Sequence, residues 1–344
     1  MKRLLVLNTS DMFYSYGGIS PFMKYMHPYL EKAFSVDYIV TPNWLLKFPG
    51  PNRFYYLIYV FLHAWRMKKY DFILSHAVEG SYVASFVGVP YAHIFHGNSN
   101  PVEFSRFFYG KWFVKVFDKM YSRIEKTASI QYTVGSIRNQ HQKKLYNPLE
   151  QNVPRVSTQS RSGFVFSGRL ESVKRVDKLI TLYSKLPNSI REENNFFIVG
   201  YGSLENDLKQ IVDNLGLNEK VIFTGKVDNS LMMKTISDKR IMLMASMTEG
   251  FPTAIAEALS VGLPVISTDV GDIASVIING KNGELLPLDF DDDDYIYKIQ
   301  AILNDYDNYA ENAYLSSTIF NSSRITADLI NDINTIIQSK NILS

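Results

Sequence analysis

The stretch TEGFPTAIAEAL, residues 248–259, holds two carboxylates at positions that suit ligand binding. Glu249 precedes a Gly-Phe-Pro turn, and Glu257 follows it inside an apolar run. Pro252 suits the first position of a helix, where its missing N–H costs nothing, and Gly262 suits the C-terminal cap. We therefore expect a helix of about ten residues that starts at Pro252, directly after the strand RIMLMAS.

The start of this helix could bind a phosphate without a metal, because its N–H groups are free and its dipole is positive there. Glu249 would accept hydrogen bonds from sugar hydroxyls. Glu257, about a turn and a half inside the helix, is costly to bury unless hydroxyls such as a ribose diol satisfy it. The alternative is two solvated glutamates, which the flanking turn and the strand PVISTD disfavour. The turn and the helix start are expected to contact the same ligand through Gly250, Phe251, Pro252 and Thr253.

Cations occur in a second segment, SGRLESVKRVDKLI. Arg169 and Lys174 lie at the end of a strand and the opening of a helix, so both can reach a diphosphate, Arg as a planar fork and Lys as a point charge. Ordinary surface cations are the alternative, and we expect that role for Arg175 and Lys178. Because Arg169 follows a strand and a glycine directly, a binding role is favoured for it.

Two glycine pairs suggest close backbone approach. Gly200 and Gly202, in VGYGSLENDL, occupy a strand-to-helix turn. Without a third glycine they are weak evidence for a dinucleotide site, but a tight turn is enough to let the backbone approach a nucleotide. Gly17 and Gly18, in YGGIS, stand at a helix start, where a plain turn is the alternative.

Metal binding is not expected. His93 and His96, in YAHIFHGN, are three apart on a strand and point to opposite faces, which makes them a poor metal pair. His96 ends the strand, where sites form, whereas His93 suits a core or surface position. The four aspartates at 291–294 are typical of a solvated helix start.

Composition is that of a soluble globular protein. The chain has 344 residues, 46% hydrophobic and 20% charged, enough for two domains. It has no cysteine, which excludes disulfides and thiolate metal sites. The apolar run in MKRLLVLNTSDMF is too short for a signal peptide, so we expect a buried first strand, and we expect no membrane span.

Charge is divided unevenly along the chain. Residues 1–150 contain 18 Lys and Arg against 9 Asp and Glu, whereas the remainder contains 18 against 25. All six histidines and all three tryptophans also lie in the first part. A basic, aromatic half can meet anionic lipid headgroups, a phosphorylated lipid or nucleic acid.

Short apolar runs alternate with helical patterns, which predicts parallel sheets covered by helices. The strand candidates are RLLVLN, VDYIV, DFILSH, YAHIFH and SIQYTV in the first half, and GFVFSG, NFFIVG, KVIFTG, RIMLMAS and PVISTD in the second. Helices are expected over residues 19–33 and 55–69. We expect an α/β protein of two Rossmann-like doubly wound domains that face a central cleft. The expected segments are a first domain (1–150), a linker (151–162), a second domain (163–321) and a C-terminal helix (322–344) that crosses back to the first domain.

Taken together, these motifs resemble the retaining glycosyltransferases of family 4, which have the GT-B architecture. The resemblance rests on SGRLESVKRVDKLI, FIVGYGSLENDL, VIFTG, EGFPTAIAEALSVGLPVISTDVG and NGELLPLD, in the family's usual order over residues 163–290. Over residues 1–150 it is looser, with only the first strand, Gly17-Gly18, His96-Gly97 and LYNPLE. Residues 271–275, GDIAS, depart from the second glycine and Pro-Glu that this family commonly has after TDVG, which bears on the identity of the sugar.

The resemblance implies an activity. Such enzymes move a sugar from a nucleotide-diphosphate donor, here UDP- or GDP-linked, to an acceptor hydroxyl, keep the anomeric configuration, and use no metal or other cofactor. No residue is assigned as a covalent nucleophile, and the departing phosphate is usually proposed to help take the acceptor proton.

The resemblance also implies roles for single residues. Glu249 would hold the sugar hydroxyls and Glu257 the ribose, while Arg169 and Lys174 would stabilise the leaving diphosphate. His96 would lie near the reacting sugar. Gly17 and Gly18 would lie beneath the phosphates and beside the acceptor.

The acceptor side is expected to meet a membrane. RFYYLIYVFLHAWRMKK and RFFYGKWFVKVF mix aromatic residues with cations, and most of these aromatics must be core. An exposed remainder could rest on anionic lipid. We therefore expect a cytoplasmic enzyme, peripherally bound to the inner face of the plasma membrane, that extends a lipid-linked glycan of a capsule, O-antigen or cell wall.

Two other functions fit parts of the pattern. A sugar-nucleotide epimerase shares the two-domain architecture, but its usual acid–base carboxylates are not evident. A non-catalytic nucleic-acid-binding protein would explain the basic half but would leave Glu249 and Glu257 without a role, so nucleic acid is not the expected partner.

Overall fold

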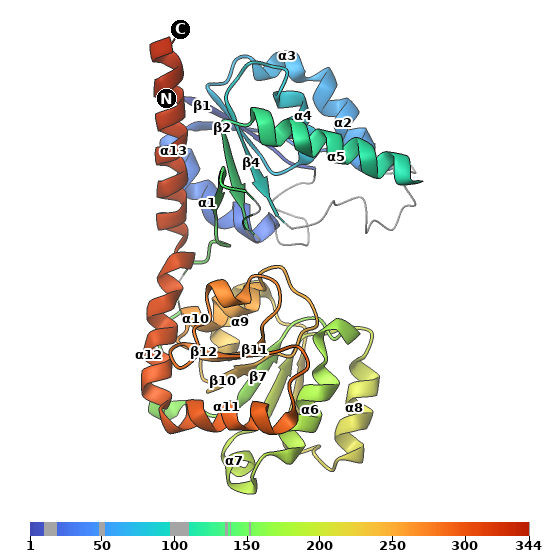
Figure 1. Ribbon diagram of the computed structural model, residues 1–344, viewed down its shortest axis with the longest axis vertical. Helices are drawn as coiled ribbons and strands as arrows, with labels where there is room; N and C mark the ends of the chain where they lie inside the picture. Colours follow the sequence, from blue (N-terminus) through green and yellow to red (C-terminus); the bar gives the residue numbers. More distant parts are fainter. Residues whose placement is uncertain are drawn as a thin grey trace. The chain divides into compact units, whose positions relative to one another are not determined.

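The computed structural model describes residues 1–9, 19–47, 52–96, 110–134, 137, 139–150 and 153–343. The chain forms two compact units (Figure 1). Unit 1 contains Met1–Pro148 and Ser322–Ser344, and unit 2 contains Leu149–Asn321. The C-terminal segment therefore belongs with the first part of the chain.

The sheet of unit 1 contains six parallel strands in the order β2-β1-β3-β4-β5-β6. Five of them coincide with the predicted apolar runs. The sixth, Gln-Lys-Lys, lies at the sheet edge and has no apolar pattern, so it was not predicted. The strands are β1 (Arg3–Leu7), β2 (Ser35–Ile39), β3 (Phe72–Ser75), β4 (Tyr91–Phe95), β5 (Ile130–Thr133) and β6 (Gln142–Lys144).

Helices cover both faces of this sheet, because successive strand residues point to opposite sides. Leu4 and Val6 pack into the cluster that α1 and α13 complete, whereas Leu5 and Leu7 pack with α2 to α5. In Figure 1, α13 runs beside α1, and the two helices are in contact. The helices are α1 (Ile19–Ala33), α2 (Asn52–Leu62), α3 (Ala64–Met67), α4 (Val78–Ala84), α5 (Gly110–Thr127) and α13 (Ser322–Leu343), with the 3-10 turn η1 (Leu45–Lys47).

The helix predicted over residues 55–69 is divided. It forms α2 and α3, with His63 between them at φ −102° and ψ 5°. The amide of His63 donates to the carbonyl of Val60 at 3.1 Å, a tighter turn than the α-helix makes. No helix in the described part of the chain is both long and apolar enough to cross a bilayer.

The sheet of unit 2 also has six parallel strands, in the order β12-β11-β10-β7-β8-β9. From β7 the chain runs outward through β8 to β9, and then crosses to the other side for β10, β11 and β12. This is the strand order of dinucleotide-binding Rossmann domains. Two Rossmann-like units were thus predicted correctly, although β12 was not recognised as a strand. The strands are β7 (Phe164–Ser167), β8 (Phe196–Val199), β9 (Val221–Gly225), β10 (Ile241–Leu243), β11 (Val265–Thr268) and β12 (Gly283–Leu286).

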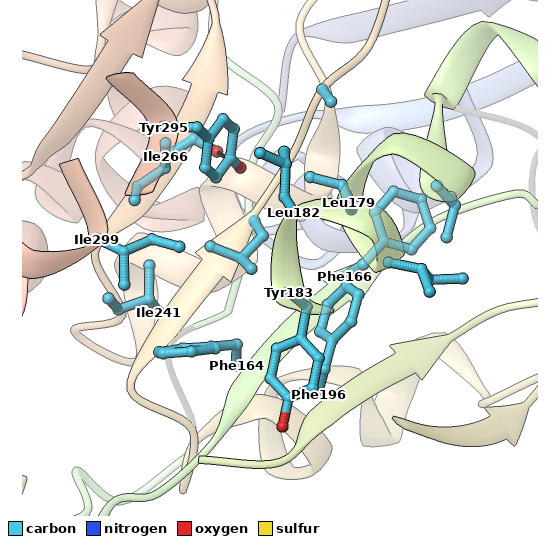
Figure 2. Close-up of a cluster of buried hydrophobic side chains, with 14 of the residues drawn as sticks. Phe164, Phe166, Leu179, Leu182, Tyr183, Phe196, Ile241, Ile266, Tyr295 and Ile299 are labelled. Atoms are coloured by element: carbon cyan, nitrogen blue, oxygen red, sulfur yellow. Dashed lines mark hydrogen bonds between the residues drawn. The ribbon is translucent and has the colours of Figure 1, made fainter. Parts of the chain in front are cut away.

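Aromatic side chains pack among aliphatic ones in one core of unit 2 (Figure 2). Tyr183 lies 6.4 Å from Phe164 and 5.7 Å from Phe196 between ring centroids, and its hydroxyl donates to the carbonyl of Asn194 at 2.8 Å. On the other face of the sheet, α10 contacts α9, α12 and β11. The helices are α6 (Val176–Lys185), α7 (Asn188–Glu193), α8 (Glu205–Asn214), α9 (Asn229–Ile236), α10 (Thr253–Ser260), α11 (Asp292–Asn304) and α12 (Tyr306–Ser316), with 3-10 turns at Thr158–Ser160, Ser172–Lys174, Ile273–Ser275 and Ser317–Phe320.

The segment predicted as a linker is anchored in unit 2 by a buried arginine. Arg161 is 1% exposed, and its guanidinium donates to the carbonyls of Val261 and Gly262, both at 2.6 Å. These bonds satisfy a charge that would otherwise be costly to bury. Because Gly262 follows α10, the arginine fixes the chain before β7 to the end of that helix.

Candidate functional site

The candidate residues of unit 2 follow the two central strands of its sheet. Arg169 comes two residues after β7, and Glu249 comes six residues after β10. These strands are neighbours, and the chain leaves them in opposite directions. In open parallel sheets, ligands bind at the carboxyl ends of the strands where the order reverses. The two segments therefore lie where a Rossmann unit binds its ligand.

Lys174 and Glu249 meet at this edge of the sheet. The Lys174 ammonium donates a hydrogen bond to Oε1 of Glu249, and the Ser246 hydroxyl donates to the same oxygen at 2.7 Å. The two charged side chains are only 16% and 9% exposed. Lys174 and Glu249, which are 75 residues apart in sequence, thus form a nearly buried ion pair. Ser246 supports this pair, and no sequence motif indicated it.

Backbone contacts hold this pair in place. The amide of Met247 donates to the carbonyl of Val173 at 2.8 Å, which joins the loop after β10 to the segment that carries Lys174. The loop after β11 also approaches Glu249. A Cβ added to Gly271, whose φ is +64°, would lie 2.1 Å from the carbonyl oxygen of Glu249. Gly271 therefore permits a close approach that any side chain would prevent.

Arg175 and Lys178 are not ordinary surface cations, contrary to expectation. Arg175 adopts a left-handed conformation, with φ 49°, and donates to the carbonyls of Ala245 at 2.5 Å and Leu288 at 3.1 Å. The Lys178 ammonium donates to the carbonyl of Phe290 at 2.9 Å and lies 3.7 Å from that ring's centroid. Both cations therefore have a structural role, because their side chains bind backbone carbonyls in loops of unit 2.

Arg169 has the opposite character. Its side chain is exposed and forms no hydrogen bond or ion pair with another described residue. A guanidinium at the end of a central strand, without a structural partner, is available for a ligand. Its planar fork suits a phosphate.

Gly200 and Gly202 bring two loops of the chain together. A Cβ on Gly200 would lie 1.8 Å from the carbonyl oxygen of Gly168, and one on Gly202 would lie 2.3 Å from that of Leu170. The amide of Leu170 donates to the carbonyl of Tyr201 at 2.9 Å. These glycines are therefore required by the approach of the loop after β8 to the loop that carries Arg169, whereas the sequence suggested approach to a nucleotide.

The helix after the Gly-Phe-Pro turn starts one residue later than expected. Pro252 is the N-cap of α10, with ψ 127°, and not its first helical residue. Gly250 and Thr253 are exposed, and the ring of Phe251 stacks on Phe320 at 5.6 Å between centroids. The amide of Ile255 donates to the carbonyl of Pro252 at 3.1 Å. The amides of Thr253 and Ala254, at the very start of α10, have no acceptor within the helix, which leaves them for an anion.

The end of α10 is as predicted. Gly262 has a φ of +69°, and the amide of Leu263 donates to the carbonyl of Ala258 at 2.9 Å. The amide of Gly262 donates to the carbonyl of Leu259 at 2.9 Å. This pair of bonds is the Schellman motif, in which glycine takes the left-handed position after a helix.

Glu257 is partly buried on α10. Burial raises the pKa of its carboxyl to about 7. It forms no hydrogen bond or ion pair with a described residue. A carboxylate in that setting gains from hydroxyl donors, since they satisfy the charge that burial disfavours.

The candidate residues of unit 1 are only partly described. His96 follows β4, and its Nε2 lies 2.7 Å from Nδ1 of His76, with the two rings stacked. Burial lowers the pKa of His96 to about 4, so the imidazole is neutral near pH 7. His93 is a core residue whose Nδ1 lies 2.7 Å from the Ser81 hydroxyl. Gly17 and Gly18 lie outside the described residues.

Among the described residues, no group of three or more His, Asp or Glu side chains is arranged to hold a metal ion. The aspartates at 291–294 form a helix start, as expected. Asp291 is the N-cap of α11, and its carboxylate accepts a hydrogen bond from the amide of Asp294 at 2.7 Å. Acidic residues in the first turn complement the helix dipole.

Comparisons with known proteins show what parts of this chain are similar to. Residues 154–316 match the family described as Glycosyl transferases group 1. The chain is 31% identical over 128 residues to N-acetyl-alpha-D-glucosaminyl L-malate synthase of Bacillus anthracis, a match that covers 37% of this chain and 32% of that protein. It is 30% identical over 142 residues to a Campylobacter jejuni protein, covering 41% of this chain and 38% of that one. The chain thus spans well under half the length of these curated relatives.

The Campylobacter relative is named GalNAc-alpha-(1->4)-GalNAc-alpha-(1->3)-diNAcBac-PP-undecaprenol alpha-1,4-N-acetyl-D-galactosaminyltransferase. Among solved structures, Anabaena Alr3699/HepE in complex with UDP covers 97% of this chain and 100% of its own, with a TM-score of 0.72 at 17% identity. At that identity the likeness concerns the fold. The fold class is therefore α/β with two Rossmann-like domains of the GT-B type, as predicted.

Proposed function

Glycosyl transferases group 1 is the family that residues 154–316 match, and on that premise we propose that the protein is a glycosyltransferase that uses a nucleotide-diphosphate sugar. One observation carries the proposal. Lys174 and Glu249 meet at the carboxyl ends of the central strands, in the same part of unit 2 as the exposed Arg169. Cations for a diphosphate and a carboxylate for sugar hydroxyls are the groups that such a donor requires.

Both partners of the ion pair keep hydrogen-bonding groups that a ligand can use. The Lys174 ammonium has three N–H donors and uses one for Glu249. The second carboxylate oxygen of Glu249, Oε2, has no hydrogen bond to a described residue. In the proposed complex, Lys174 donates to the donor's phosphate while Oε2 accepts from a sugar hydroxyl. Arg169 binds the diphosphate through its guanidinium.

The proposed reaction retains the anomeric configuration. The bond from the sugar C1 to the diphosphate oxygen breaks, and the acceptor oxygen forms its bond to C1 on the same face. The acceptor proton passes to an oxygen of the departing phosphate, so no covalent nucleophile is needed. Negative charge grows on the diphosphate during this step, and Arg169, Lys174 and the first amides of α10 therefore stabilise the transition state more than the ground state.

The remaining roles are proposed from the same arrangement. Glu257 accepts hydrogen bonds from the ribose diol, which would hold its carboxyl in the ionised form. Gly250, Phe251 and Thr253 line the helix start that meets the phosphates. A role for His96 near the sugar stays a prediction from the family resemblance.

We further propose a UDP-linked donor, a lipid-linked glycan acceptor and a metal-independent reaction at the cytoplasmic face of a membrane. The UDP complex of Anabaena Alr3699/HepE supports the choice of base, and GDP is the second candidate. The Campylobacter relative is named for a PP-undecaprenol-linked substrate, which supports a lipid-linked acceptor.

A donor screen tests the proposal. UDP- and GDP-sugars are incubated with the full chain, and release of the nucleotide diphosphate is measured with and without EDTA. We expect turnover of one sugar nucleotide that EDTA leaves unchanged, and NMR of the product should show retention. Isomerisation of the free sugar nucleotide with no diphosphate release would instead favour an epimerase. No turnover of any donor, together with no binding of UDP or GDP, would contradict the assignment.

A further inference from the structure

Helices α2 and α3 of unit 1 carry an exposed apolar surface. Within α2, spacings of four, three and one residues place its four exposed apolar side chains along one side of a helix that turns roughly 100° per residue, and a fifth follows in α3. Each member is between 44% and 70% exposed. This surface, called the α2–α3 face below, consists of Phe54, Ile58, Phe61, Leu62 and Trp65.

The opposite side of the same helices already serves the core. Tyr56, Val60 and Met67 are 0% exposed and pack with residues of α4 and α5. A helix at the surface of a folded unit needs only one apolar side. The α2–α3 face is therefore not explained by the packing of unit 1. Contiguous exposed apolar surface on a protein generally marks an interaction site.

The charged residues in the segment that carries this face are of one sign. From residue 38 to residue 70 the sequence contains no Asp or Glu and five cations. Arg53 is paired with the buried Glu79 at 3.0 Å. The cations Arg66, Lys68 and Lys69 are exposed and directly follow Trp65. The Arg66 guanidinium lies 5.3 Å from the centroid of the Trp65 ring.

We propose that the α2–α3 face binds the surface of a lipid bilayer that contains anionic lipids. Helices α2 and α3 both lie in the plane of the membrane, with Phe61, Leu62 and Trp65 at the boundary between headgroups and acyl chains. The three cations beside Trp65 meet the lipid phosphates. Apolar contact supplies affinity, and the absence of carboxylates over 33 residues supplies the preference for anionic lipid. This binding would bring the enzyme to the lipid-linked acceptor and so rests on the proposed function, but the binding itself needs no sugar nucleotide.

Vesicle flotation tests the proposal with the full chain. Vesicles of phosphatidylcholine alone are compared with vesicles of equal parts phosphatidylcholine and phosphatidylglycerol. We expect the protein to bind the anionic vesicles and to lose affinity as salt is raised. The variant Phe61→Ser/Leu62→Ser/Trp65→Ser should lower the partition coefficient at least about tenfold. Replacing Arg66, Lys68 and Lys69 with glutamine should lower the partition coefficient about fivefold for each charge removed.

Matched controls come from exposed residues of unit 2. Leu231→Ser/Tyr297→Ser removes apolar side chains that are 52% and 66% exposed, and Lys234→Gln/Lys281→Gln removes two exposed cations. Both controls should bind vesicles as the unaltered chain does. Because every altered side chain is exposed, thermal unfolding should be unchanged in all variants.

A fluorescence measurement locates the contact. In the variant Trp44→Phe/Trp112→Phe, Trp65 is the sole tryptophan of the chain. Its emission should shift to shorter wavelength on anionic vesicles and should be quenched by lipids with brominated acyl chains. Equal vesicle binding by the triple serine variant and the unaltered chain, or a Trp65 emission indifferent to vesicles, would overturn the proposal. So would a dimer that the triple serine variant converts to a monomer, if the unaltered chain binds no vesicles.

The outcomes separate this proposal from the proposed function. The triple serine variant should still release the nucleotide diphosphate from a donor in the absence of membranes. Lost vesicle binding with normal donor turnover therefore supports the membrane proposal and leaves the transferase proposal standing. Vesicle binding by a chain that turns over no donor would contradict only the transferase.

Discussion

Units 1 and 2 share a six-stranded parallel sheet but differ in what they place around it. In unit 2 the carboxyl ends of β7 and β10 carry an ion pair and an exposed arginine. In unit 1 the conspicuous groups are stacked histidines after β3 and β4 and the α2–α3 face, an apolar surface that its core does not use. The difference is that the chemistry proposed for unit 2 depends on single residues in loops, whereas the membrane contact proposed for unit 1 depends on the composition of a helix surface.

The largest change in activity is expected when the ion pair of unit 2 is removed. Glu249→Ala removes the carboxylate that is proposed to hold the sugar, and we expect kcat/KM to fall by about 10²–10³. The measurement is steady-state diphosphate release with the donor found in the screen. Glu219→Ala, which removes an exposed carboxylate of the same unit, should leave the rate unchanged. A fall of less than about tenfold for Glu249→Ala would mean that the carboxylate does not act in the transition state.

The next effect concerns the glycines that position the loops of unit 2. Gly200→Ala places a Cβ 1.8 Å from a backbone oxygen, so the free energy of unfolding should fall by ~3 kcal/mol or more. Gly250→Ala is the matched control, because no atom lies within 4 Å of its added Cβ. Urea unfolding of both variants measures the difference. Equal stability of the two would contradict the close packing of the loops after β7 and β8.

A pH-dependent effect should come from Glu257. Its folded-state pKa of about 7 lies above the ordinary value of 4.5, so the folded chain binds a proton more tightly than the unfolded chain. The free energy of unfolding should therefore fall as pH rises from about 4.5 through about 7, by ~2–3 kcal/mol. Glu257→Gln should remove this fall between pH 5 and pH 8, whereas Glu219→Gln should retain it. An unchanged pH slope in Glu257→Gln would show that burial does not disfavour the charge.

The smallest effect should separate the two sides of α2 in unit 1. Phe61→Ser alters an exposed side chain, and we expect the free energy of unfolding to change by less than ~0.5 kcal/mol. Tyr56→Ala, on the buried side of the same helix, should cost ~3 kcal/mol or more. Chemical denaturation measures both. A large loss in Phe61→Ser would mean that unit 1 needs the α2–α3 face for its own stability.

The strands of both units were largely predictable from the sequence, because buried parallel strands read as short apolar runs. The exceptions have physical reasons. β6 is a polar edge strand, and β12 has the sequence GELL, in which a glycine and a glutamate leave only two apolar residues in the run. The division of residues 55–69 at His63 depends on a local turn that the apolar period does not reveal.

The candidate site was predictable in outline. Arg169 and Glu249 were placed at the ends of strands, and the Rossmann order then makes those strands neighbours. Contact between Lys174 and Glu249 was not predictable, since it depends on how two loops pack. The same holds for Arg175, whose left-handed backbone turns its side chain to the carbonyls of Ala245 and Leu288.

The central claim is that cations of unit 2 bind a nucleotide through its diphosphate. Isothermal titration of UDP and of uridine into the unaltered chain, Arg169→Ala and Lys174→Ala tests it most directly, with GDP and guanosine as the second pair. The unaltered chain should bind one nucleotide diphosphate at least about 10²-fold more tightly than its nucleoside, and each variant should lose most of that difference. Equal affinities for diphosphate and nucleoside in all three proteins would contradict the claim.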